Sequence, residues 1–141
     1  MAAPRISLVT LGVADMDRAL AFYEAWGWKR VDREGGLVMF QANGTLIALF
    51  GLADLAEDQA RPGATLGTGA MTLAQNYATE AEVDEVFAEA LAAGATELKR
   101  PQAVFWGGYS GYVADPDGHV WELAMNPFWP LDPDGTVALG G

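Results

Sequence analysis

The sequence predicts an α+β fold built from two tandem β-α-β-β-β modules in a single domain of 141 residues. Three observations support this prediction. Short β-forming runs are separated by strong turn signals, two amphipathic helices each begin at a capping residue and end at a Gly, and the same order of elements occurs twice. Hydrophobic residues make up 51% of the chain, which is sufficient for a substantial core.

The first module is expected over residues 5–52 and opens with a strand at 5–13. Asp15 is a favoured N-cap, and the apolar residues after it recur at helical spacing until Gly27 ends the helix. An Asn-Gly pair then indicates a hairpin. The short strands expected around it span residues 28–31, 36–42 and 44–50.

The second module is expected over residues 69–126, after a linker at 53–68 with room for a helical turn. It begins with a strand at 70–77. Thr79 and Glu82 form a capping-box pattern that opens a helix, and Gly94 closes this helix. A strand at 96–99 and a final hairpin complete the module, and residues 127–141 form a C-terminal tail.

The final hairpin contains the most informative carboxylate of the chain. The turn Asp115-Pro116-Asp117-Gly118 lies between strands expected at 109–114 and 119–124. A three-residue loop places Tyr112 opposite Glu122, on the same face of the sheet. A carboxylate in an apolar strand is usually paired, metal-bound or protonated. The other interpretation is that Glu122 lies on the solvent face of an edge strand, and the sequence leaves both open.

The two modules can be aligned residue by residue. Placing Gly44 on Gly118 puts Ala48 on Glu122, and placing Gly27 on Gly94 superposes the two helix ends. This agreement indicates an internal duplication.

Charge and composition limit the classes of partner. The net charge is −11, from 19 acidic and 8 basic residues, so nucleic acid and anionic membranes are not expected as partners, and a cationic or neutral small molecule is favoured. The absence of Cys excludes disulfides and thiolate chemistry. The N-terminal apolar run is interrupted too early by acidic residues to be a signal peptide, and we expect a cytoplasmic protein.

The segments LVTLGVADMDRALAFYEAWGW and GYVADPDGHVWEL resemble the vicinal oxygen chelate superfamily, which contains glyoxalase I, extradiol dioxygenases and the fosfomycin- and bleomycin-resistance proteins. This resemblance implies that the two modules form curved mixed sheets around a central cavity, and that the protein is a homodimer. It supports a prediction of fold better than one of reaction, because this fold carries several unrelated chemistries.

The resemblance also implies where a metal would bind. The metal-ligand positions of the family correspond to Leu8, Ala48, Thr72 and Glu122, and only Glu122 has a ligand-type side chain. His119 lies three residues before Glu122, so on a strand it points to the other face. We therefore expect no metal and no other cofactor.

The predicted ligand site is centred on Glu122. Tyr112 is expected beside it, and Trp106 and Tyr109, which flank a Gly pair, are expected at the rim of a cavity, with Leu8, Ala48 and Thr72 as further lining residues. Binding of a planar or cationic molecule, as in drug sequestration of the bleomycin-resistance type, is the leading hypothesis. The alternatives are a lyase or isomerase in which Glu122 is the general base and Tyr112 assists, a metal-dependent glyoxalase or dioxygenase if the ligand register is shifted, and a purely structural module.

Overall fold

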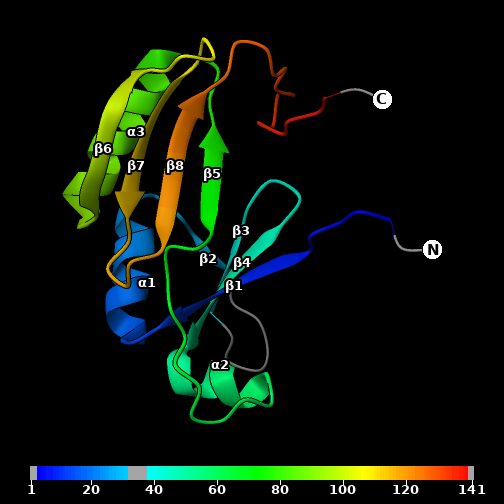
Figure 1. The fold of residues 1–141 in the computed structure, drawn as a ribbon, viewed down its shortest axis with the longest axis vertical. Helices are drawn as coiled ribbons and strands as arrows, with labels where there is room; N and C mark the ends of the chain where they lie inside the picture. Colours follow the sequence, from blue (N-terminus) through cyan, green and yellow to red (C-terminus); the bar gives the residue numbers. More distant parts are fainter. Residues whose placement is uncertain (1–2, 32–37, 140–141) are drawn as a thin grey trace. The chain divides into compact units, whose positions relative to one another are not determined.

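The computed structural model describes residues 3–31 and 38–139, and the chain divides into two compact units, Met1–Leu66 and Gly67–Gly141 (Figure 1). Each unit contains one four-stranded mixed sheet. The predicted α+β fold of two β-α-β-β-β modules is confirmed. The boundary between the units falls inside the segment 53–68 that the sequence indicates as a linker.

The first unit contains a sheet with the strand order β1-β4-β3-β2, in which β1 is parallel to β4. Its elements are β1 (Leu8–Val13), α1 (Met16–Ala25), β2 (Arg30–Val31), β3 (Val38–Gln41), β4 (Leu46–Gly51) and α2 (Leu52–Asp58). The first two residues of the strand predicted at 36–42 lie outside the described residues. The remaining strands lie where the sequence predicts them, with somewhat later starts.

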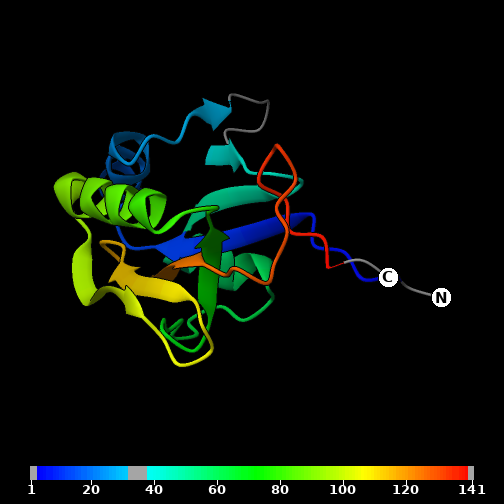
Figure 2. The same cartoon turned by 90° about the horizontal axis from the view of Figure 1, so that it is seen from above.

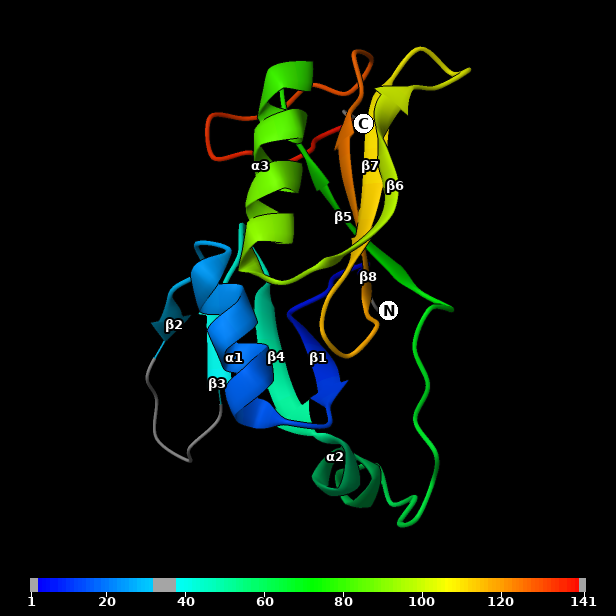
Figure 3. The same ribbon diagram turned by 90° about the vertical axis from the view of Figure 1, so that its left-hand side faces the viewer.

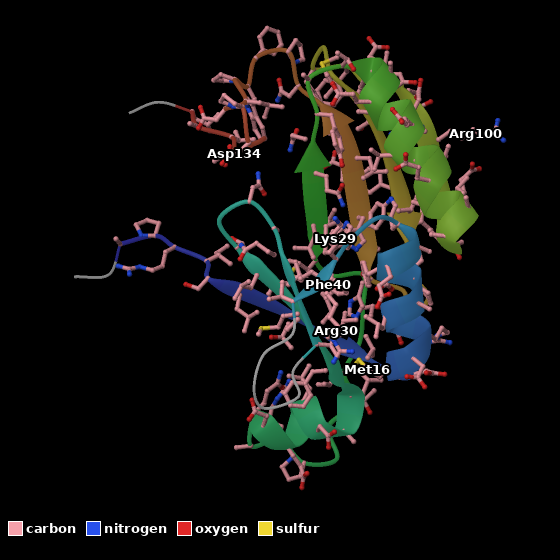
Figure 4. The ribbon with its side chains drawn as sticks, turned by 180° about the vertical axis from the view of Figure 1, so that it is seen from behind. Met16, Lys29, Arg30, Phe40, Arg100 and Asp134 are labelled. Carbon is pink, nitrogen blue, oxygen red and sulfur yellow. The ribbon has the colours of Figure 1, made fainter. Side chains whose placement is uncertain are left out.

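Helix α1 forms where its caps predict it. The Asp15 carboxylate accepts a hydrogen bond from the backbone N–H of Arg18 at 3.1 Å, and Gly27 has a φ of 107°, which a residue with a side chain rarely adopts. The helix packs on one face of the first sheet, where the ring of Tyr23 lies 5.9 Å from the ring of Phe40 (Figures 3 and 4). Aromatic packing therefore contributes to the core of this unit, together with aliphatic residues such as Leu11 and Leu49.

Helix α2 occupies the segment expected to be a linker and is more regular than a single turn. Leu52, Leu55 and Ala56 share one face of this seven-residue helix, and Ala56 is buried. A side chain at Gly12 would meet Leu52 at 2.8 Å, so α2 packs closely against β1. The apolar residues at the start of α2 make this contact. The small residues around them hide the helical pattern in the sequence.

The second unit contains a sheet with the strand order β5-β8-β7-β6, in which β5 is parallel to β8. Its elements are β5 (Thr72–Asn76), α3 (Glu80–Ala93), β6 (Thr96–Ala103), β7 (Tyr109–Ala114) and β8 (Val120–Met125). Strand β6 is twice as long as predicted, because two register shifts let it pass through Pro101. The predicted pairing of Tyr112 with Glu122 is confirmed.

Helix α3 covers one face of the second sheet (Figures 2 and 3). Thr79 caps it by accepting a hydrogen bond from the N–H of Glu82 at 3.1 Å, and Gly94 ends it with a φ of 115°. The hydroxyl of Thr79 also donates to the carboxylate of Glu82. The buried residues on its sheet-facing side are Val83, Phe87 and Ala90. They and the buried Trp121 and Leu123 of β8 belong to the core.

The internal duplication is visible in the strand register. In the first sheet Ala48 lies between Thr10 and Met39, and in the second sheet Glu122 lies between Ala74 and Tyr112. The turn glycines that align in sequence both have positive φ, 82° at Gly44 and 94° at Gly118. The two units therefore repeat the order of their elements and the position of one residue within the sheet.

The C-terminal tail repeats the turn of the last hairpin on a small scale. Leu131 and Val137 form an isolated bridge around a second Asp-Pro-Asp-Gly turn, in which the N–H of Asp132 donates to the carbonyl of Thr136 at 2.9 Å. The carboxylate of Asp134 accepts from the N–H of Thr136, and this hydrogen bond lowers its pKa (Figure 4). Within the described residues, none of the helices is long and apolar enough to cross a membrane.

Candidate functional site

Glu122 lies on an inner strand of the second sheet. Strand β8 is placed between β5 and β7, so the interpretation of Glu122 as a residue of an edge strand is wrong. Its neighbours Trp121 and Leu123 are buried in the core, and Glu122 points to the opposite side because strand residues alternate. We call this side, away from α3, the α3-distal face, and on its inner strands it carries Ser110, Tyr112, Ala114, Val120, Glu122 and Ala124.

The carboxylate of Glu122 is coupled to the phenol of Tyr112. Both side chains are half-buried and are direct cross-strand partners. Burial, the negative charge of Glu122 and a hydrogen bond with its carboxylate raise the pKa of the Tyr112 phenol, in that order of size. In the described part of the chain no Lys, Arg or His forms an ion pair with Glu122. The pair therefore places one carboxylate on the α3-distal face, with a phenol beside it.

Tyr109 does not join this pair, which corrects the expectation of a rim beside Glu122. It is displaced by three residues from Tyr112, so its ring lies on the α3 side of the sheet. Its hydroxyl donates to the carboxylate of Asp84 on α3 at 2.6 Å, and this hydrogen bond is the main reason why the pKa of Tyr109 rises to about 12.

Trp106 lies in the loop before β7, with 36% of its surface exposed. Its ring rests on the backbone of Gly108, where a side chain would overlap it. The ring of Phe128 from the tail lies against Gly107 in the same way, at 3.3 Å from where a side chain would begin. The Gly pair is therefore a packing surface for two aromatic rings, and ligand contact by Trp106 stays a prediction.

Thr72 is the predicted lining residue that shares a face with Glu122. It pairs with Val120 at the beginning of β5, whereas Ala74 is the direct partner of Glu122. Gln75 has the opposite orientation, as expected, and accepts a hydrogen bond from the hydroxyl of Tyr77. Burial is the main cause that raises the pKa of Tyr77 to about 12, with the carboxylates of Glu89 and Glu82 adding to it.

Leu8 and Ala48 belong to the first unit and share one face of its sheet. The register pairs Ala48 with Thr10, and Leu8 lies two residues before Thr10 on the same strand. This face is opposite to α1, since Phe40 lies on the side that contacts Tyr23. Ala48 is buried, and Leu8 is 45% exposed.

The donor set does not fit the metal that the resemblance implies. Zn, Ni and Fe sites need three or four ligands from imidazole, thiolate and carboxylate, but Leu8 and Ala48 have no donor atom and Thr72 has a neutral hydroxyl. Among residues 3–31 and 38–139, no group of three or more His, Cys, Asp and Glu side chains could hold a metal ion. We therefore derive no chemistry from a metal.

Two residues of the α3-distal face are not among the site residues that the sequence predicts. Ser110 is 3% exposed and lies beside Ala124, and Lys99 on β6 is the register partner of Tyr112. The register shifts in β6 break simple alternation, so counting from the strand start assigns Lys99 to the wrong face. Gly111 carried a usable signal, because a Gly within a β-rich run often marks a bulge or close approach.

The family model "Glyoxalase/Bleomycin resistance protein/Dioxygenase superfamily" matches residues 5–123. A glyoxalase-related enzyme from Fulvimarina pelagi is 38% identical with a TM-score of 0.88, over 99% of this chain and 100% of that one. The structure of lactoylglutathione lyase from Agrobacterium tumefaciens is 26% identical with a TM-score of 0.68, over 93% of this chain and 100% of that one.

A further solved structure, a glyoxalase/bleomycin resistance protein/dioxygenase family enzyme from Burkholderia phytofirmans PsJN, supports the fold alone. It is 22% identical with a TM-score of 0.73, over 84% of this chain and 96% of that one. Curated proteins give no match. The family model covers most of the chain, and the chain therefore belongs to the Glyoxalase/Bleomycin resistance protein/Dioxygenase superfamily.

Proposed function

We propose that this protein binds a small planar or cationic organic molecule on the α3-distal face of its second sheet, with Glu122 and Tyr112 as the polar contacts and with no metal or other cofactor. One observation carries the proposal. Glu122 is a half-buried carboxylate on an inner strand, the direct cross-strand partner of Tyr112, and without an ion-pair partner among the described residues. A charge held in this way is available to a ligand.

The charge of the whole chain supports a cationic ligand. The net charge of −11 attracts cations, and Glu122 provides a local negative charge with a defined orientation. Drug sequestration of the bleomycin-resistance type is the specific activity that we propose, because the superfamily includes bleomycin-resistance proteins and sequestration requires binding without chemistry. The aromatic ring of Tyr112 adds an apolar surface beside the carboxylate for a planar group.

Calorimetric titration with planar amines, with 4-methylbenzylamine as the first probe, tests this function. We expect Glu122→Gln to weaken binding by about 10-fold or more, because a charge-assisted hydrogen bond is lost. Glu97→Gln is the matched control, since it removes the same charge from the exposed edge strand β6, where Glu97 pairs with Arg100 at 3.2 Å. Equal losses in both variants, or no binding of any amine to the wild type, would reject the proposal.

The cross-strand pair of carboxylate and phenol also favours a second candidate, a lyase or isomerase. In this reaction Glu122 removes a proton from a carbon next to a carbonyl group and Tyr112 donates a hydrogen bond to the developing oxyanion. The proton held by Glu122 exchanges with solvent, and Glu122 then returns a proton to a neighbouring carbon. Two of the solved relatives, a glyoxalase-related enzyme and a lactoylglutathione lyase, have names that agree with such an activity. Deuterium incorporation from solvent into carbonyl compounds tests it. Incorporation no faster than with Glu122→Ala would exclude it.

A further inference from the structure

We propose that the ligand of the α3-distal face carries an acidic group, a carboxylate or a phosphate, and that Lys99 binds this group. The inference rests on the proposed function, because it concerns the same face and names the second charge of the molecule that occupies it. The two contacts together define the expected ligand. It has a cationic or hydrogen-bond-donating end at Glu122 and an anionic end at Lys99.

The strand register places these side chains in one row. Glu122 pairs with Tyr112 across β8 and β7, and Tyr112 pairs with Lys99 across β7 and β6. Paired residues share a face of the sheet, and we infer from this pairing, which lies between the two register shifts of β6, that Lys99 projects from the α3-distal face. Neighbouring strands are about 4.8 Å apart, which separates the backbones at Lys99 and Glu122 by about 10 Å, with the phenol between them.

Lys99 is a free cation in an acidic environment. Its side chain is exposed, and within the described residues it forms no ion pair or hydrogen bond. The adjacent base, Arg100, is bound to Glu97 at 3.2 Å and projects outward beside α3 (Figure 4). Apart from Arg100 and His119, the second unit has no other basic residue. The lysine at the end of the Glu122 row is therefore the charge of this unit that is available to an anion.

The flexible four-carbon stem of Lys99 lets its ammonium group follow ligands of different length, whereas Glu122 is held in place by Tyr112. The carboxylate thus fixes one end of the ligand, and the lysine selects for charge at the other end. A net charge of −11 repels an anionic ligand, so any preference for an acidic group requires a local cation.

Two isosteric probes test this inference, 4-(aminomethyl)benzoate and 4-(aminomethyl)benzamide, which differ only in the charge opposite the amine. We expect the wild type to bind the benzoate about two- to fivefold more tightly, the range for an exposed ion pair. In Lys99→Gln this preference should vanish or reverse. It should persist in Arg100→Gln, which removes a neighbouring positive charge that does not lie on the α3-distal face.

The outcomes separate the inference from the function on which it rests. Equal affinities of the wild type for the two probes, or an unchanged preference in Lys99→Gln, would overturn the role of Lys99. An equal loss of preference in Lys99→Gln and Arg100→Gln would overturn it too, because the effect would then be one of net charge. In each of these cases, weaker binding of both probes to Glu122→Gln would still support the proposed function. If the wild type binds neither probe, both proposals fail.

Discussion

A carboxylate on an inner strand is stable in this protein because Glu122 is neither fully buried nor alone. Its half-buried position keeps part of its hydration, and the hydrogen bond with Tyr112 compensates for some of the rest. The apolar residues on either side of it, Trp121 and Leu123, point to the other face of the strand. Trp121 and Leu123 therefore flank Glu122 in sequence but do not share its face of the sheet.

The tyrosine pKa values provide a direct test of these contacts. We expect Glu122→Gln to lower the pKa of Tyr112 toward 10, because both the negative charge and the hydrogen bond that favour the neutral phenol are weakened. Asp84→Asn should likewise lower the pKa of Tyr109 from about 12 and leave Tyr112 unaffected. NMR titration of ¹³C-labelled tyrosine rings measures both values. A pKa of Tyr112 that is the same in Glu122→Gln and the wild type would disprove the coupling.

The sign of the pH dependence follows from the same shifts. Each raised pKa means that the folded state holds the phenol proton more tightly than the unfolded state does. The stability from these contacts is therefore fully present below the unfolded pKa, about 10, and is lost as the pH rises through the folded value. For Tyr77 and Tyr109, whose folded pKa is about 12, this window lies between about pH 10 and 12.

At the scale of single elements, the start of α3 depends on one hydroxyl. We expect Thr79→Ala to reduce the free energy of unfolding by about 1 kcal/mol, since the N–H of Glu82 loses the oxygen that accepts its hydrogen bond. Thr79→Ser is the control and should stay within a few tenths of a kcal/mol of the wild type. Urea denaturation measures the difference. A loss as large in Thr79→Ser as in Thr79→Ala would show that packing of the methyl group, and not capping, is responsible.

Strand β6 passes so close to β7 that only Gly fits at position 111. A side chain there would lie 2.8 Å from the carbonyl oxygen of Lys99 and from the nitrogen of Pro101, both of them backbone atoms. We expect Gly111→Ala to cost about 1–3 kcal/mol of folding free energy, the usual range for overpacking. Gly67→Ala is the matched control, because Gly67 has open space around it and no positive φ. Similar melting temperatures for the two variants would contradict the close approach.

The Gly111 variant also bears on ligand binding. If β6 must shift to make room for an extra methyl group, Lys99 moves with it, because its carbonyl oxygen is one of the atoms in contact. The register shift in β6 thus sets the position of Lys99 opposite Tyr112. An irregular strand defines one end of the proposed ligand site.

At the scale of the whole molecule, two units share one architecture but differ in the residues of the equivalent face. Ala48 of the first unit occupies the position that Glu122 occupies in the second, and Met39 occupies that of Tyr112. The duplication has therefore kept the backbone register and changed the chemistry. Membership of the superfamily fixes the fold of such a chain, whereas the reaction depends on these few positions.

Elemental analysis tests the expectation that no metal is part of the functional protein. We expect no stoichiometric Mn, Fe, Ni, Zn or Mg in the purified protein and no rise in melting temperature when these ions are added, because the family's ligand positions here are Leu8, Ala48, Thr72 and Glu122. A chelator-treated sample is the reference. One bound metal per chain, with a matching rise in melting temperature, would establish a metal site with other ligands and would favour glyoxalase or dioxygenase chemistry.

The sequence by itself determined the order of the elements and the local geometry of their ends. Asp15, Thr79 and the Gly residues after each helix act on neighbours a few residues away, so their effect can be derived without knowledge of the fold. The turn at Asp115 fixed the pairing of Tyr112 with Glu122 for the same reason, since a short loop sets the register of its own hairpin.

Only the tertiary structure decided which strands lie inside each sheet and what the irregular strand places on each face. The inner position of β8 depends on its parallel pairing with β5, a contact between segments more than forty residues apart. Because of the register shifts in β6, Lys99 pairs with Tyr112, the partner of Glu122. Tyr109 lies on the α3 side of the sheet, where its hydroxyl donates a hydrogen bond to Asp84. Long-range pairing and bulges arise from packing between elements, and local sequence patterns do not contain this information.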